Sequence, residues 1–97
     1  MTDVSAKTVT TTGYITGSAT ATQPSRVKGI YYVASGTAGS ITLKDGGASG
    51  TTLMIIATPA SATATEYVVV PSNGVRFSTD VHATLANVTS LTIFHDG

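Results

Sequence analysis

The middle of the chain contains two short runs of apolar residues, at positions 53–56 and 67–70. Both include β-branched residues and are followed closely by a proline, Pro59 or Pro71, and such short, bounded runs predict strands rather than helices. A half-exposed strand alternates apolar with polar residues, whereas both runs are apolar at every position. We therefore expect these strands to be covered on both faces, by the core of the domain on one side and by a partner on the other.

Alternating patterns predict further strands after Pro24. In residues 25–33 the alternation gives one mostly apolar face and one amphipathic face. The mostly apolar face holds Val27, Gly29, Tyr31 and Val33, and the amphipathic face holds Arg26, Lys28, Ile30 and Tyr32. Residues 40–44 alternate cleanly, with Ile41 and Leu43 expected to point inward. Three later segments also alternate, and their alternating apolar residues are Val75, Phe77, Val81, Ala83, Leu85, Leu91 and Ile93. Residues 95–97 are expected to form a frayed terminus.

Turn residues separate these segments. Asp45, Gly46 and Gly47 form a strong turn signal because glycine tolerates a positive φ, and residues 71–74 have the composition of a tight turn. Short strands at regular spacing, with no helical period between them, are typical of a β-sandwich or a small barrel. We predict an all-β fold: a single small β-sandwich, jelly-roll-like, with seven or eight short antiparallel strands over residues 25–97, preceded by an N-terminal extended arm over residues 1–24.

The first 24 residues are rich in Thr, Ser, Ala and Gly. Their only substantial apolar residues are Val4, Val9, Tyr14 and Ile15, which are too few to bury much surface. Two interpretations remain open: a Thr-rich edge strand around residues 8–16, or an extended arm that becomes ordered against a neighbouring subunit. We favour an arm that contains one short strand.

The first apolar run also predicts an interface. In a regular strand Leu53, Ile55 and Ala57 share one face, while Met54 and Ile56 share the other face with two threonines. We expect the mixed face to be the interface, so that Ile56→Asp would dissociate a folded subunit and Ile55→Asp would unfold it. The residues expected at interfaces are therefore Val4, Val9, Tyr14, Ile15, Met54 and Ile56.

The composition limits the partners that we expect. Only 10% of the residues are charged, five of each sign, and the net charge is zero. Without a clustered basic excess the chain cannot steer nucleic acid or an anionic membrane toward itself, so we expect no direct nucleic-acid partner and no membrane partner. The absence of cysteine excludes a disulfide framework and a Cys-ligated zinc. No secretory signal or membrane span is predicted, and we expect the cytosol or a particle assembled there.

Candidate chemistry is sparse. The two histidines, His82 and His95, and the scattered carboxylates do not form a metal-binding or acid–base pattern, and no serine lies in a nucleophile-elbow motif. The glycines of residues 46–50 precede a predicted strand, whereas a phosphate-binding loop precedes a helix. We therefore predict no catalytic, cofactor-binding or metal-binding residue and no enzymatic activity.

Two binding alternatives remain open at this point, and the first concerns the strand at residues 25–33. Arg26, Lys28, Tyr31 and Tyr32 could form a basic, aromatic face of the kind that stacks single-stranded nucleic acid, although the protein as a whole is neutral. A carbohydrate-binding β-sandwich module is the other alternative, but the chain lacks the tryptophan that usually provides the stacking surface.

The chain from about residue 26 onward resembles a known group of proteins. The segments that carry the resemblance are VKGIYYVASGTAGSITLKDGG, TTLMIIATP and EYVVVPSNGVRFSTDVHATLANVTSLTIF, and the strongest part begins at Val70 and contains GVRFSTDVHATL. This part of the chain is similar to small virion structural proteins encoded by tailed bacteriophages, especially marine and cyanobacterial ones. No functional residue is transferred from them, because no motif of theirs marks a site.

The resemblance implies a non-enzymatic component of the virion, assembled in the host cytoplasm. The expected role is that of a capsid decoration or cement protein, commonly a homotrimer, that bridges subunits of the major capsid protein. A tail or neck adaptor, or a fibre-attachment component, is the alternative within the particle. The neutral chain and the strands that are apolar on both faces agree with burial against neighbours.

Overall fold

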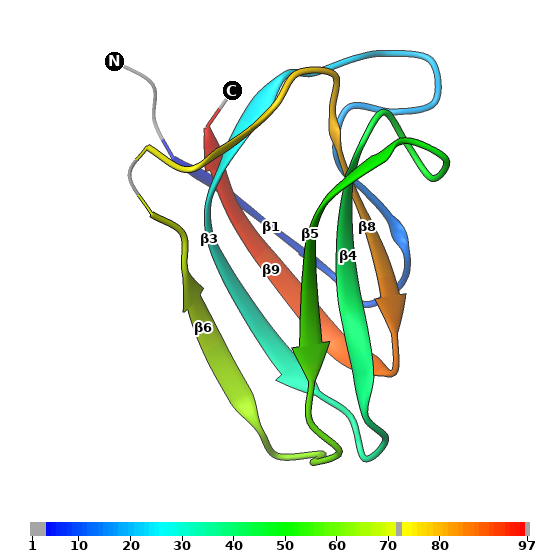
Figure 1. Ribbon diagram of the computed structural model, residues 1–97, viewed down its shortest axis with the longest axis vertical. Helices are drawn as coiled ribbons and strands as arrows, with labels where there is room; N and C mark the ends of the chain where they lie inside the picture. The colour runs from blue at the N-terminus through cyan, green and yellow to red at the C-terminus, as the bar shows by residue number, and fades with distance from the viewer. Residues whose placement is uncertain (1–3, 72, 97) are drawn as a thin grey trace.

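The computed structural model of the protein describes residues 4–71 and 73–96, which form two antiparallel sheets and no helix (Figure 1). The strands are β1 Ser5–Val9, β2 Gly13–Thr16, β3 Ser25–Ala34, β4 Gly39–Asp45, β5 Thr51–Thr58, β6 Thr65–Val69, β7 Val75–Phe77, β8 Val81–Ala86 and β9 Val88–Asp96. The predicted all-β sandwich is confirmed. Seven of these strands, β3–β9, lie within residues 25–96, which agrees with the predicted number, and the N-terminal segment adds β1 and β2.

The strand order identifies the topology. The first sheet has the order β1-β9-β3-β6, with β7 pairing with the start of β3, and the second sheet has the order β2-β8-β4-β5. Apart from β7, the chain changes sheet at every connection except the hairpin between β4 and β5. Eight strands in two four-stranded sheets with this alternation form a jelly roll.

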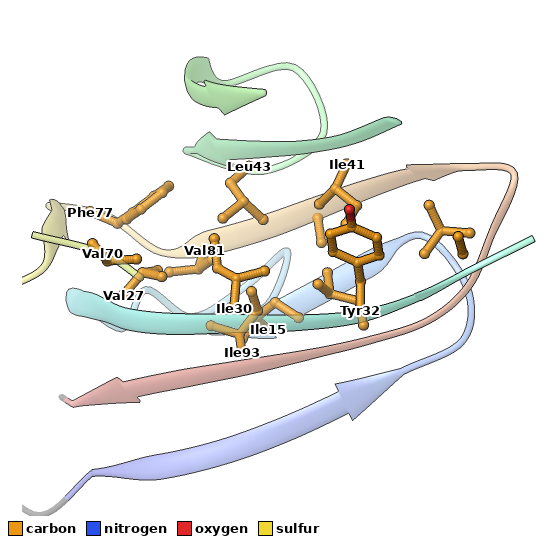
Figure 2. Close-up of a cluster of buried hydrophobic side chains, with 14 residues drawn as sticks. Ile15, Val27, Ile30, Tyr32, Ile41, Leu43, Val70, Phe77, Val81 and Ile93 are labelled. Carbon is orange, nitrogen blue, oxygen red and sulfur yellow. The ribbon is translucent and has the colours of Figure 1, made fainter. Parts of the chain in front are cut away.

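The core lies between the two sheets. Ile41 and Leu43 from β4 face Ile30 from β3 and Ile93 from β9, and all four side chains are fully buried (Figure 2). Burial of a side chain of this size contributes about 1.5–3 kcal/mol. The inward positions predicted for Ile41 and Leu43 are confirmed, and the alternating apolar residues of β7, β8 and β9 also lie in the core or pack against it.

The N-terminal segment is part of the sandwich. β1 pairs with β9 and β2 pairs with β8, so residues 5–16 form an edge strand in each sheet. Ile15 is a core residue, and Val9 packs against the core. The extended arm is therefore wrong for residues 5–16: two sheet edges offer backbone hydrogen-bonding partners, and Ile15 supplies an apolar anchor. Residues 1–3 of the predicted arm lie outside the described residues.

A bulge in β3 changes which residues point inward. The register with β9 shifts between Val27 and Gly29, which makes Lys28 an extra residue. Such a residue reverses the alternation beyond it. The faces predicted for residues 25–33 are consequently wrong after the bulge: Ile30 and Tyr32 are buried, and Tyr31 points outward.

The two faces of β5 are the reverse of the prediction. Met54 and Ile56 pack against the core, whereas Ile55 is 69% exposed and Leu53 is 41% exposed. The predicted effects of aspartate at positions 55 and 56 must therefore be exchanged. The pattern was ambiguous because both faces of this strand are apolar, so alternation could not indicate which one faces the core.

The C-terminal residues are ordered by pairing. His95 pairs with Ser5 of β1 and Val27 of β3, and Asp96 pairs with Arg26. The predicted frayed terminus is wrong for residues 95 and 96, because strands on both sides of β9 extend that far. Gly97 lies outside the described residues.

Candidate interaction surfaces

The described residues, 4–71 and 73–96, do not enclose a pocket. Within the same residues, no three His, Cys, Asp or Glu side chains come together in a way that could hold a metal ion. The described part of the chain also contains no helix long and apolar enough to cross a membrane. Candidate sites must therefore be sought among the surfaces of the two sheets.

Two aspartates connect the loops at one end of the sandwich. The Asp45 carboxylate accepts hydrogen bonds from the Ser78 hydroxyl (2.9 Å) and from the backbone N–H groups of Ser78 (3.1 Å), Thr79 (2.8 Å) and Asp80 (3.3 Å). In return, Asp80 Oδ1 accepts from the N–H groups of Gly46 (3.1 Å) and Gly47 (3.0 Å). Both carboxylates are thus occupied by backbone donors, and this arrangement is a structural clamp.

The clamp affects the titration of one of these groups. Burial raises the pKa of Asp45, but the hydrogen bonds from Thr79, Ser78 and Asp80 outweigh that effect and hold the pKa below its ordinary value of 3.8. The charged carboxylate is therefore the form that fits the folded loops.

His82 lies on the outer side of β8 but is covered by its neighbours. Tyr14 on β2 packs edge-on against its ring, with the ring centroids 4.9 Å apart, and His82 is 4% exposed. Burial lowers the pKa of His82; the positive charge of Lys44 lowers it further, and Asp80 opposes the shift. Its Nδ1 atom has no hydrogen-bond partner. His82 is therefore a buried side chain in surroundings that favour its neutral form.

His95 is also buried, on the inner side of β9. Burial lowers its pKa, the Asp96 carboxylate opposes this shift, and Lys7 adds to it. Because His82 pairs with Tyr14 on the second sheet and His95 lies on the first sheet, the two histidines belong to different layers. They do not form a common site.

The outer face of the first sheet carries a cluster that we call the aromatic face: Tyr31, Tyr67, Val69 and Phe94. Tyr31 and Tyr67 are directly opposite on β3 and β6, and the rings of Tyr67 and Phe94 meet edge to face at 6.1 Å. Gly29 lies beneath Tyr67, where an added Cβ would collide with the phenol oxygen. Tyr67 is 52% exposed and Val69 is 76% exposed, so the face is open to solvent.

Basic residues adjoin the aromatic face at one end. Arg26 of β3 lies opposite Arg76 of β7 on one side and opposite Asp96 of β9 on the other. Lys28 forms an ion pair with Asp96, with 3.4 Å between Nζ and Oδ2. The predicted basic, aromatic strand face is present only in part. Tyr32 is buried in the core, so Tyr31 alone of the two tyrosines lies on this side.

A second apolar surface lies along β5, the last strand of the second sheet. Leu53, Ile55 and Ala57 are exposed on its outer side, next to the polar residues Thr42 and Ser40 of β4. The sequence analysis predicted an interface on the face of Met54 and Ile56, but these two side chains pack against the core, so the exposed face of β5 is the other one.

The residues predicted at interfaces do not form one surface. Tyr14 and Ile15 are on β2, at the edge of the second sheet opposite to β5, where Met54 and Ile56 lie. Val4 is exposed just before β1 in the other sheet. The sequence offered no signal for the aromatic face, because Tyr31, Tyr67 and Phe94 are distant in the chain and come together only through strand pairing.

The chain was compared with protein-family models, curated proteins and solved structures, and no match was found in any of the three comparisons.

Proposed function

We propose that the chain is a non-enzymatic structural protein of a bacteriophage virion, a capsid decoration protein that associates with copies of itself and bridges subunits of the major capsid protein. The observation that supports this proposal most directly is the distribution of exposed apolar side chains. The large ones among the described residues are Val4, Tyr31, Leu53, Ile55, Tyr67 and Val69, and all except Val4 are on β3, β5 and β6.

These three strands lie toward one side of the sandwich. β1 and β2 are in contact with each other, so β6 and β5 end the two sheets toward the opposite side (Figure 1). The exposed apolar side chains near these sheet ends form two patches, one on the outer face of each sheet, and exposed apolar patches favour contacts with other proteins. The low charge of the chain, 10% against about 25% in typical domains, also favours close packing in an assembly.

Binding to capsids tests this proposal. Purified chain should bind to capsids that lack it until a fixed ratio to the major capsid protein is reached, as measured by sedimentation of the capsids and quantification of the bound protein. Val69→Lys should weaken binding, because it charges the most exposed large apolar side chain. Thr11→Lys, an exposed position between β1 and β2, is the matched control. Absence of binding, or binding without saturation, would contradict the proposal.

A carbohydrate-binding role is a second candidate, favoured by the aromatic face. Tyr31 and Tyr67 lie side by side and exposed, and aromatic rings with hydroxyl groups can pack against the apolar face of a sugar while the hydroxyls form hydrogen bonds. The adjacent Arg26 and Arg76 would favour an acidic glycan. Binding to a glycan panel that is lost in Tyr67→Ala would support this role, and a panel without binding would exclude it for those glycans.

A further inference from the structure

β5 is a free sheet edge that is regular from Met54 to Thr58; its one bulge, at Leu53, lies near the start of the strand. In the described part of the chain it pairs only with β4, so the backbone groups on its other side have no strand partner. Thr51–Thr58 contains no charged residue and no proline. Free edges of this kind pair readily with another strand, and proteins usually block them with charges, prolines or short length.

The other edges carry such protection. β1 has Lys7 at its centre and β6 contains Glu66, and both strands are five residues long. β2 has four residues, and its register with β8 is irregular after Tyr14. β7 has three residues, with Arg76 in the middle. The contrast indicates that pairing is prevented elsewhere and permitted at β5.

A partner for β5 must satisfy three requirements at once. It must bring a strand backbone, it must bring apolar side chains to cover Leu53 and Ile55, and it must not require an opposite charge. A second copy of β5 meets all three. We propose that two copies of the chain pair through β5 in antiparallel fashion, which joins the two second sheets into one continuous eight-stranded sheet. This proposal refines the self-association included in the proposed function and depends on it.

The two faces of β5 restrict how the strands can pair. Residues opposite each other in a sheet point to the same face, and Met54 and Ile56 point inward while Ile55 points outward. At the two-fold axis, one residue of β5 must therefore lie opposite the same residue of the second copy. An axis that placed a residue opposite its chain neighbour would pair an inward side chain with an outward one. Because Leu53 is an extra residue in the register with β4, the regular part of β5 runs from position 54 to position 58.

The expected contact is small. The eight residues of β5 extend over roughly 26 Å, and the shortest dimension of the molecule is 18 Å. A contact of this length and thickness covers an area of about 470 Å² per copy at most. Stable interfaces bury about 800 Å² per partner, so the isolated dimer should be weak. A two-fold dimer also differs from the trimer that the resemblance implies, because a trimer requires two different surfaces to meet.

Sedimentation velocity from about 5 µM to about 1 mM tests the pairing, a range suited to a small interface. The wild-type chain should convert from monomer to dimer. Ile55→Lys should raise the dissociation constant about tenfold or more, because like charges then lie close together across the axis. Val69→Lys, which places the same charge on the first sheet, should leave the dimer unchanged.

Cysteine cross-linking provides an independent measurement, because the chain has no cysteine of its own. Opposite Cα atoms in an antiparallel pair are about 4.5–5.5 Å apart, within the range for a disulfide. Among Met54→Cys, Ile55→Cys and Ile56→Cys, the position on the two-fold axis should form a covalent dimer under mild oxidation, and Val69→Cys should not.

Each alternative result is informative. A monomer at all concentrations, a trimer, or a dimer unaffected by Ile55→Lys would overturn pairing through β5. If the chain dimerises through β5 but does not bind to capsids, the pairing holds and the decoration role fails. If it binds to capsids as a monomer, the decoration role holds and the pairing fails.

Discussion

At the scale of single residues, Asp45 and Asp80 stabilise the end of the sandwich where the β4–β5 turn meets the segment before β8. Each carboxylate accepts backbone hydrogen bonds from the loop that carries the other aspartate. Gly46 and Gly47 have φ angles of 104° and 83°, which other residues rarely adopt. The turn therefore depends both on its glycines and on an acceptor, Asp80, that is 33 residues or more away in sequence.

Asp80→Ala should lower the free energy of unfolding by about 2–4 kcal/mol, because the N–H groups of Gly46 and Gly47 lose their acceptor. Asp80→Asn should cost less, since the amide oxygen can still accept both hydrogen bonds. Urea denaturation measures both variants. Equal stability of Asp80→Ala and the wild type would mean that the clamp contributes nothing.

At the scale of elements, bulges determine which side chains of β3 and β5 face the core. Each adds one residue to its strand, Lys28 in β3 and Leu53 in β5. The Lys28 bulge places Tyr31 on the outer face and thereby creates the aromatic face with Tyr67.

The β5 faces give a direct test. Ile56→Asp should destabilise the fold by about 3 kcal/mol or more, because it places a charge against the core. Ile55→Asp should leave the fold intact, because that side chain is 69% exposed. Thermal unfolding followed by circular dichroism compares the two; a more stable Ile56→Asp than Ile55→Asp would show that the faces are assigned wrongly.

Two glycines in strands differ in what surrounds them. A Cβ at Gly39 would collide with the carbonyl group of Ala86, which belongs to the backbone, whereas a Cβ at Gly29 would meet the end of the Tyr67 side chain, which can move. Gly39→Ala should therefore destabilise the protein much more than Gly29→Ala. The midpoints of their urea unfolding curves test this, and similar midpoints would contradict the predicted crowding at Gly39.

Regular alternation made much of this fold predictable. β4, β7, β8 and β9 were recognised because residues such as Ile41, Leu43 and Phe77 alternate with polar neighbours, and local pattern is sufficient for such strands. β3 and β5 were assigned the wrong faces because a bulge, or an apolar run without alternation, leaves local pattern ambiguous. The aromatic face could not be predicted, since the register between β3, β6 and β9 forms it.

At the scale of the whole molecule, a thin sandwich combines a closed core with apolar side chains exposed on the outer faces of both sheets, near the ends formed by β5 and β6. Its shortest dimension is 18 Å, so the core is a single layer of side chains between two sheets. Two histidines are buried in the sheets, where burial favours their neutral form, and this links the stability of the small fold to pH.

The free energy of unfolding should fall as the pH falls below about 6.5. Burial lowers the pKa of His82 and His95 in the folded state. At a pH between the folded and the unfolded pKa, the unfolded chain therefore binds more protons than the folded chain, and acid favours unfolding. The hydrogen-bonded Asp45 carboxylate adds stability that is complete above 3.8 and is lost as the pH falls through its lowered pKa. Urea denaturation from pH 8 to pH 4 should show the decline in the free energy of unfolding that the histidines cause. Replacing both histidines with glutamine should flatten this decline. An unchanged pH profile in that double variant would refute this assignment.

The central claim, that the chain is a structural part of a virion, is tested most directly by its copy number in purified particles. Quantitative mass spectrometry would measure the chain against the major capsid protein. A copy number equal to that of the major capsid protein, or a simple fraction of it, is the result predicted for a decoration protein. A few copies per particle would assign the chain to the tail or neck instead, and its absence from particles would contradict the structural role.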